Sequence, residues 1–185
     1  MEGNALLKTR RSVRRYRQEP IPVDVLREIA DAARYAPSGG NSQPWELVAV
    51  NDPEKVDQVY ETLAWLPSVG APPEGKRPVA YFVVISEKES SVADCASLVS
   101  HLLLAAHERG IGSCWFGSIR RAELADDLNI PEDYRVAFVV SLGYPDEKFE
   151  TYETTGQTKV APENGTVRVP KRPLNSIFHK NGFGS

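Results

Sequence analysis

The feature that most restricts the fold of this chain is an uninterrupted apolar run at positions 79–85, Val-Ala-Tyr-Phe-Val-Val-Ile. A strand with one face in water alternates apolar and polar residues, whereas this run carries no charged or amide side chain on either face. It therefore predicts a central strand over Val79–Ser86 that is covered on both faces. Helices must supply that cover.

Five segments have the spacing of helices that would flank this strand. The predicted helices start at about Asn4, cover Pro22–Arg34, and run from Pro53 to about Leu66, from about Ser91 to Arg109 and from about Arg121 to Leu128. Further strands are predicted over Trp45–Val50, Ser113–Phe116 and Val136–Leu142. The fold class is therefore α+β with a central sheet. Because the chain contains no internal repeat or low-complexity tract, it is interpreted as a single domain over 1–185.

Two long segments lack this periodicity. Residues 66–78 contain six prolines and glycines among thirteen positions, which predicts an irregular flap between a helix and a strand. Long loops of this kind often cover active sites, so a lid is one interpretation. Residues 146–170 are polar, rich in Thr and Glu, and are expected to wrap around the surface as a loop.

Composition excludes several classes of protein. The chain has 185 residues with 22 Lys and Arg against 25 Asp and Glu, a net charge of −3, and no uncharged apolar stretch near the ~20 residues that cross a membrane. The first residues do not resemble a secretory signal, so a cytoplasmic location is expected. Cys95 and Cys114 are too few for a disulfide scaffold and are expected to be reduced core thiols. The three histidines lack metal-ligand spacing, so no metal site is expected.

A basic cluster stands out in this acidic chain. Six basic residues occur within ten positions without an acidic residue between them: Lys8, Arg10, Arg11, Arg14, Arg15 and Arg17. Arg10 and Arg14 are one helical turn apart and Ser12 adds a hydroxyl, a combination that suits a dianionic phosphate. The alternatives are a solvated basic face or a nucleic-acid patch. The negative total charge argues against nucleic acid as a partner.

A second segment combines turn-forming and amide residues between a helix and a strand, Ala-Pro-Ser-Gly-Gly-Asn-Ser-Gln-Pro-Trp over 36–45. Its glycines allow close approach of a ligand, and the side chains of Asn41 and Gln43 can pair with a heterocycle edge or a polyol. By itself the segment is equally typical of an ordinary connecting loop.

Together, Arg10-Arg11-Ser12-Val13-Arg14 and this loop resemble the start of the nitroreductase family of flavoenzymes. The resemblance continues through Leu103–Ala106, Gly110–Phe116, Ile130-Pro131 and Leu142–Pro145, and it reaches Lys171–Leu174. It therefore covers almost the whole chain, and it rests on the order and spacing of several short motifs. It implies a central mixed, mainly antiparallel sheet flanked by helices, in an intertwined homodimer that binds FMN at the subunit interface.

The resemblance also implies roles for individual residues. Arg10, Arg11 and Ser12 match residues that hold the FMN phosphate, and Arg14 matches a basic residue near the pyrimidine edge of the flavin. The loop contributed by the partner subunit corresponds to Pro37, Ser38, Gly39 and Asn41, although Gly39 and Gly40 replace the Ser or Thr often found there. The stretch along the flavin ring corresponds to Cys114, Trp115, Phe116 and Gly117, with the Gly117 amide as donor to N5. The basic pair that closes over the phosphate corresponds to Lys171 and Arg172.

The function implied is an FMN-dependent oxidoreductase with a ping-pong cycle. Hydride would pass from NADH or NADPH through FMN to a nitroaromatic, a quinone or a similar electron-poor small molecule. Alternatives on the same fold are reductive dehalogenation, ring oxidation and flavin breakdown. A flavin- or polyanion-binding protein without turnover is a further alternative. One departure from larger family members is that Lys76 and Arg77 precede the central strand without the Asn found there.

Overall fold

The computed structural model describes residues 3–87 and 89–184 and divides into two compact units. The first unit comprises the chain up to Ala64 together with Pro72–Asp146, and the second comprises Trp65–Ala71 together with the chain from Glu147 onward. The interpretation of 1–185 as one domain stays a prediction.

The first unit is built on an antiparallel sheet. Its strands follow the order β1 (Tyr16–Arg17), β5 (Tyr134–Pro145), β3 (Ala80–Glu87) and β2 (Glu46–Val50), and β4 (Gly112–Phe116) also pairs with β5. The central position predicted for the apolar run is confirmed, because β3 lies between β2 and β5 and all its residues except Glu87 are buried.

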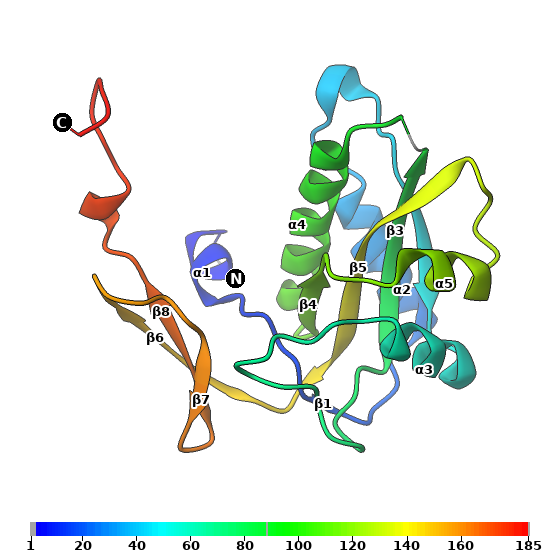
Figure 1. Cartoon of the computed structure of the whole chain (residues 1–185), viewed down its shortest axis with the longest axis horizontal. Coiled ribbons are helices and arrows are strands. Elements are labelled where there is room, and N and C mark those ends of the chain that lie inside the picture. The colour runs from blue at the N-terminus through cyan, green and yellow to red at the C-terminus, as the bar shows by residue number, and fades with distance from the viewer. Residues whose placement is uncertain (1–2, 88, 185) are drawn as a thin grey trace. The chain divides into compact units, whose positions relative to one another are not determined.

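Helices cover both faces of this sheet, as Figure 1 shows for its α4 side. Helix α2 (Val23–Ala33) packs beside α4 (Val92–Glu108), and both enclose a core that includes the β3 residues Ala80, Phe82 and Val84. Successive side chains of a strand point to opposite faces, so Tyr81 and Val83 face the other side of β3, which α3 (Pro53–Glu61) contacts. Helix α5 (Arg121–Asp127) packs on β5, and α1 (Gly3–Thr9) contacts α4.

The predicted helices all exist, but the third ends earlier than expected. The side chain of Asp52 caps α3 by accepting hydrogen bonds from the amides of Glu54 and Lys55, as the sequence indicates. The helix ends at Glu61 rather than near Leu66. The reason is that residues 62–64 pair with residues 118–120: the Ala64 amide donates to Ser118 and the Arg120 amide donates to Thr62.

One buried tyrosine fixes the N-terminal segment on the sheet. Tyr16 has no exposed surface, and its hydroxyl donates to the Val13 carbonyl while lying 2.7 Å from Ser141 Oγ. Its ring packs on Gly143, where an added Cβ would lie 2.6 Å from Tyr16 Cδ1. A Cβ at Gly112 would likewise lie 2.8 Å from Val13 Cγ2. Residues 13–16 can therefore lie flat on the sheet only because two glycines leave room for them.

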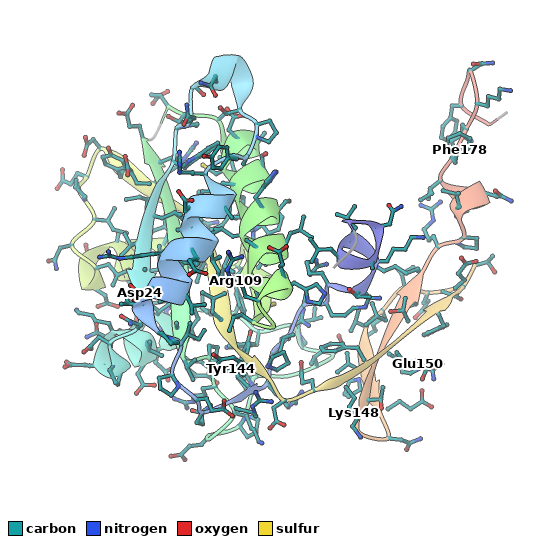
Figure 2. The ribbon with its side chains drawn as sticks, turned by 180° about the vertical axis from the view of Figure 1, so that it is seen from behind. Asp24, Arg109, Tyr144, Lys148, Glu150 and Phe178 are labelled. Carbon is teal, nitrogen blue, oxygen red and sulfur yellow. The ribbon has the colours of Figure 1, made fainter. Side chains whose placement is uncertain are left out.

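The second unit corrects the prediction that 146–170 is a surface loop. This region contains β6 (Lys148–Glu153), β7 (Ala161–Glu163) and most of β8 (Thr166–Lys171), which form a sheet in the order β6-β8-β7 with β6 and β8 parallel. Figure 2 shows Lys148 and Glu150 along β6. The prediction missed these strands because their residues are mostly polar. Charge pairs between neighbouring strands stabilise this sheet in place of buried apolar side chains: Arg168 lies 2.6 Å from Glu150 and 3.7 Å from Glu163.

A local signal for this sheet was nevertheless present in the sequence. Asn164 and Gly165 both have positive φ, 49° and 76°, and they join β7 to β8 as a two-residue hairpin turn. An Asn-Gly pair between short strands is a strong indicator of such a turn. In the other segment, residues 66–78, the structure contains no helix or strand, so the irregular flap is confirmed and its role as a lid stays a prediction.

The described helices include none that is both long enough and apolar enough to span a bilayer.

The packing of Tyr16 on Gly143 generates a stability prediction. Gly143→Ala should lower the free energy of unfolding by about 1–3 kcal/mol, because the added methyl group overlaps a buried ring and forces the backbone to shift. Urea unfolding followed by circular dichroism measures this change. Gly3→Ala is the control and should not lower stability, because a Cβ there meets no atom within 4 Å and alanine favours the helix that begins at this residue. Equal stability of the two variants would contradict the packing described.

Candidate active site

The structure brings two of the predicted site segments together. The Val13 amide donates to the Ser113 carbonyl at 2.9 Å, and Ser12 and Ser113 form an isolated parallel bridge. The segment from Arg10 to Arg14 therefore runs beside β4, which leads into Gly117. These two segments are about 100 positions apart in the sequence, and the Tyr16 packing holds them side by side.

Arg10 and Arg11 place two positive charges close together in this segment. Arg10 is half-buried, and its pKa is lowered mainly by burial and also by neighbouring Arg11, while the nearby Cys114 thiol acts in the opposite direction. No carboxylate of the described residues forms an ion pair with Arg10. Burial lowers the pKa of Arg11 as well. Two crowded guanidinium groups would be relieved of repulsion by a dianion, so the residues present fit a phosphate group.

Arg14 is held differently from these two arginines. Its Nη1 donates to the Ser12 carbonyl at 3.1 Å, so the side chain folds back over the segment that bears Arg10 and Arg11. This contact fixes a third positive charge close to the same stretch of backbone.

The end of β4 presents one aromatic ring and one bare backbone position to solvent. Trp115 is 37% exposed and meets Phe138 edge to face, with ring centroids 4.9 Å apart. Gly117 is exposed, and a Cβ there would meet no atom within 4 Å. The side chains of Cys114 and Phe116 are buried, at 3% and 5% exposure. Contacts of a planar ligand with these two residues would therefore have to use their backbone atoms.

Arg121 fixes the backbone at Gly117. Its guanidinium donates to the carbonyls of Gly117 at 2.8 Å, Val136 at 3.0 Å and Ala137 at 3.4 Å. On the other side of this connection, the Ser118 carbonyl accepts from the Ala64 amide. The peptide that follows β4 is thus tied both to β5 and to the end of α3. Sequence reasoning missed Arg121 because an arginine at the start of an exposed helix gives no sign that it binds carbonyl groups.

The predicted partner loop lies at the other end of α4. The Gly39 amide donates to Asp94 in the first turn of α4 at 3.0 Å, and Ser38 Oγ accepts from the Gln43 amide. Three residues of this loop, Gly40, Asn41 and Gln43, have positive φ, which makes it a compact turn. Figure 1 shows it as the light-blue turn near one end of α4.

The arginine segment adjoins the opposite end of that helix. His107, in the last turn of α4, lies 2.9 Å from Thr9 through Nε2 and Oγ1. Thirteen residues of α-helix separate Asp94 from His107, which corresponds to about 20 Å. Within one chain, therefore, the structure does not bring Pro37, Ser38, Gly39 and Asn41 to the arginines.

The last two predicted residues belong to the second unit. Lys171 ends β8, where its carbonyl accepts from the Thr154 amide at 2.8 Å, and Arg172 Nη2 donates to the Ser176 carbonyl at 2.5 Å. Both side chains are exposed. Their predicted role at the phosphate stays a prediction.

Neither the cysteines nor the histidines of the described residues form a disulfide or a metal-binding group. Cys95 and Cys114 are both free and buried, which confirms the expectation of reduced core thiols. Within 3–87 and 89–184 there is no group of three or more His, Cys, Asp or Glu placed to hold a metal ion.

The fold and the arginine cluster together define an α+β protein with a basic segment beside an accessible strand end. The Nitroreductase family model matches residues 7–144 of the chain. This chain therefore belongs to the nitroreductase family, and it has the nitroreductase fold.

Individual relatives support this assignment. A protein of Archaeoglobus fulgidus assigned as an NADH dehydrogenase/NAD(P)H nitroreductase is 37% identical over 80% of this chain and 88% of its own length. The iodotyrosine deiodinase of Thermotoga neapolitana is 30% identical over 80% and 90%. Among solved structures, the FMN-dependent nitroreductase of Clostridium difficile R20291 has a TM-score of 0.73 and 26% identity, over 97% of this chain and 99% of that one. The family thus includes similar proteins with two different activities.

The Arg121 contacts generate a prediction about local order. Arg121→Ala should cost about 1–3 kcal/mol of unfolding free energy, because it leaves carbonyl groups near Gly117 and Val136 without donors. It should also speed amide hydrogen exchange at residues 116–118. Arg120→Ala is the matched control, since Arg120 pairs at the surface with Glu123 and its loss should change stability by less than about 0.5 kcal/mol. Unchanged exchange in Arg121→Ala would refute the positioning role.

Proposed function

We propose that this chain is an FMN-dependent oxidoreductase that takes hydride from NADH or NADPH and reduces flat, electron-poor small molecules such as nitroaromatics or quinones. The observation that carries this proposal is the position of the arginine segment beside β4 in a chain of the nitroreductase family. When bound, FMN would supply the electron chemistry by accepting hydride at N5 and passing it on in a ping-pong cycle. The protein itself would bind and orient FMN and shield the reacting ring from water.

Arg10, Arg11 and Ser12 are proposed to hold the phosphate group of FMN. A guanidinium group binds phosphate oxygens through paired, charge-assisted hydrogen bonds, and the hydroxyl of Ser12 adds a neutral donor. Arg14, folded over the same segment, would place positive charge at the pyrimidine edge of the flavin. Positive charge at that edge favours the reduced, anionic flavin.

The end of β4 is proposed to run along the flavin ring. The Gly117 amide would donate to N5, and the lack of a side chain there leaves room for a planar ring. The backbone of Cys114 and Phe116 and the exposed ring of Trp115 would border the same site. Arg121 would keep the amide aligned through its hydrogen bond to the Gly117 carbonyl.

We further propose a homodimer in which each site uses residues of both chains. Because the 38–43 loop and the arginines sit about 20 Å apart at opposite ends of α4, the loop residues Pro37, Ser38, Gly39 and Asn41 would reach a flavin bound by the partner subunit. Lys171 and Arg172 would close over the phosphate. Light scattering should then give twice the 20.5 kDa of one chain.

Reductive dehalogenation is the second candidate function. It is favoured by the similarity to the Thermotoga neapolitana iodotyrosine deiodinase, of which the matched region spans 90%. The two functions differ in the second substrate, so release of iodide from 3-iodotyrosine, compared with consumption of a nitroaromatic, distinguishes them.

The first test is an absorbance spectrum of the purified protein followed by anaerobic addition of NADH or NADPH. A yellow protein whose flavin band bleaches with either nucleotide is the expected result. A yellow protein that neither nucleotide reduces would rule out the proposed donor and favour the flavin-breakdown or ring-oxidation alternatives. A colourless protein that takes up no added FMN would rule out the proposed cofactor.

A charge-removal variant tests the phosphate site. Arg10→Ala should weaken FMN binding by about 10- to 100-fold, because a charge-assisted contact to phosphate contributes about 1.5–3 kcal/mol. Flavin fluorescence titration measures the Kd. Arg17→Ala is the control: it lies in the same basic cluster, but Arg17 is exposed and paired with Glu19 at 2.7 Å, so FMN affinity should stay within about twofold. If both variants bind FMN as tightly as the unmodified protein, Arg10 does not hold the phosphate.

A further inference from the structure

The loop of residues 38–43 has a backbone conformation that its own sequence does not favour. Gly40, Asn41 and Gln43 have positive φ values of 58°, 58° and 47°, and for the two residues with side chains this conformation is unfavourable. Inside the loop, the Gln43 amide donates to Ser38 Oγ and the Asn41 amide donates to the Ser38 carbonyl, both at 3.0 Å. An unfavourable conformation persists only where surrounding contacts fix it, so the loop depends on an anchor outside itself.

Asp94 supplies this anchor from the first turn of α4. Its Oδ1 accepts a hydrogen bond from the Gly39 amide at 3.0 Å, and within the described part of the chain it is the one side chain outside 38–43 that hydrogen-bonds to the loop. A Cβ added at Gly39 would lie 3.7 Å from Asp94 Oδ2, so the carboxylate packs directly against the loop backbone. A hydrogen bond from an amide to a carboxylate is about twice as strong as one between neutral groups.

The sequence around Asp94 shows that this contact replaces a more common one. Ser91-Val-Ala-Asp94 has the pattern of a capping box, in which the serine and the acidic residue both cap the first turn of their own helix. In the structure, Ser91 makes no side-chain capping hydrogen bond, and Asp94 binds Gly39. Helix α4 therefore begins without the cap that its sequence offers, and the carboxylate of Asp94 holds the loop.

We propose that Asp94 is a positioning residue of the flavin site: it holds the 38–43 loop in the conformation that binds FMN on the partner subunit. This inference deepens the proposed function and rests on it, since it takes FMN as the ligand and the homodimer as the assembly. Without the Asp94 contact, the loop populates other conformations. The apparent affinity for FMN then falls in proportion to the fraction of molecules that keep the binding conformation.

Fluorescence titration of the flavin-free, full-length protein tests this role. Asp94→Ala should weaken FMN binding by about five- to fiftyfold, within the limit of roughly 100-fold that one hydrogen bond to a charged group sets. Asp94→Asn, whose side-chain carbonyl can still accept from the Gly39 amide, should recover most of this loss. The matched control is Asp24→Ala, which removes the acidic residue from the first turn of the neighbouring helix α2 (Figure 2) and should leave the Kd within about twofold.

Amide hydrogen exchange reports on the loop before any FMN is added. The Gly39 amide should exchange faster in Asp94→Ala than in the unmodified protein, because its acceptor is gone. Asp94→Asn should restore the protection, and Asp24→Ala should leave it unchanged. Equal exchange at Gly39 in Asp94→Ala and in the unmodified protein would overturn the positioning role.

A mixed dimer shows whether Asp94 acts on the site of its partner. One chain carries Arg10→Ala and the other carries Asp94→Ala. If the loop reaches the partner subunit, one site has both defects and the other has neither, so the dimer should bind one FMN with the affinity of the unmodified protein. If the loop serves its own chain, each site has one defect and neither binds FMN with that affinity. That result, or a protein that is a monomer, would contradict the inference.

Failure of this inference and failure of the proposed function give different results. If the unmodified protein binds FMN and Asp94→Ala binds it equally well, Asp94 does not position the loop, and the proposed function stands. If the unmodified protein binds no FMN, the proposed function is wrong, and the inference that rests on it is wrong as well.

Discussion

The contact between the Tyr16 ring and Gly143 is the constraint on which the candidate site depends. It fixes residues 13–16 against β5, and through the Val13 amide it sets the arginine segment beside β4. The packing of Tyr16 opposes the repulsion between Arg10 and Arg11. A buried aromatic ring whose hydroxyl is hydrogen-bonded is not easily displaced, so it keeps this segment in place.

The sequence predicted the parts of the fold whose local signals agree with burial. The apolar run ending at Ile85 gave the central strand, and Asp52 before Pro53 gave the start of α3. Prediction from the sequence failed where pairing with a residue far away in the chain determines the secondary structure. Helix α3 ends early because Leu63 pairs with Ile119, and β6 is a strand because it pairs with β8. Neither pairing leaves a periodic trace in the strand or helix concerned.

The candidate site shows the same division. Motif resemblance found Arg10–Arg14 and Cys114–Gly117, and the structure places these segments side by side. The residues that support them, Tyr16 and Arg121, were missed, because their role is defined by which carbonyl groups their side chains reach in three dimensions. In the sequence, a tyrosine within a basic stretch and an arginine at the start of a short helix give no sign of these contacts.

The two close glycine contacts also have a consequence for protein engineering. At Gly112 and Gly143 any side chain would collide with Val13 or Tyr16, so a mutagenesis library aimed at new acceptors gains nothing from varying these positions. Trp115 differs from the glycines, since its ring is partly exposed and its described ring contact is with Phe138 rather than with Val13 or Tyr16. A search for altered selectivity would therefore keep the glycines and Tyr16 constant and diversify position 115.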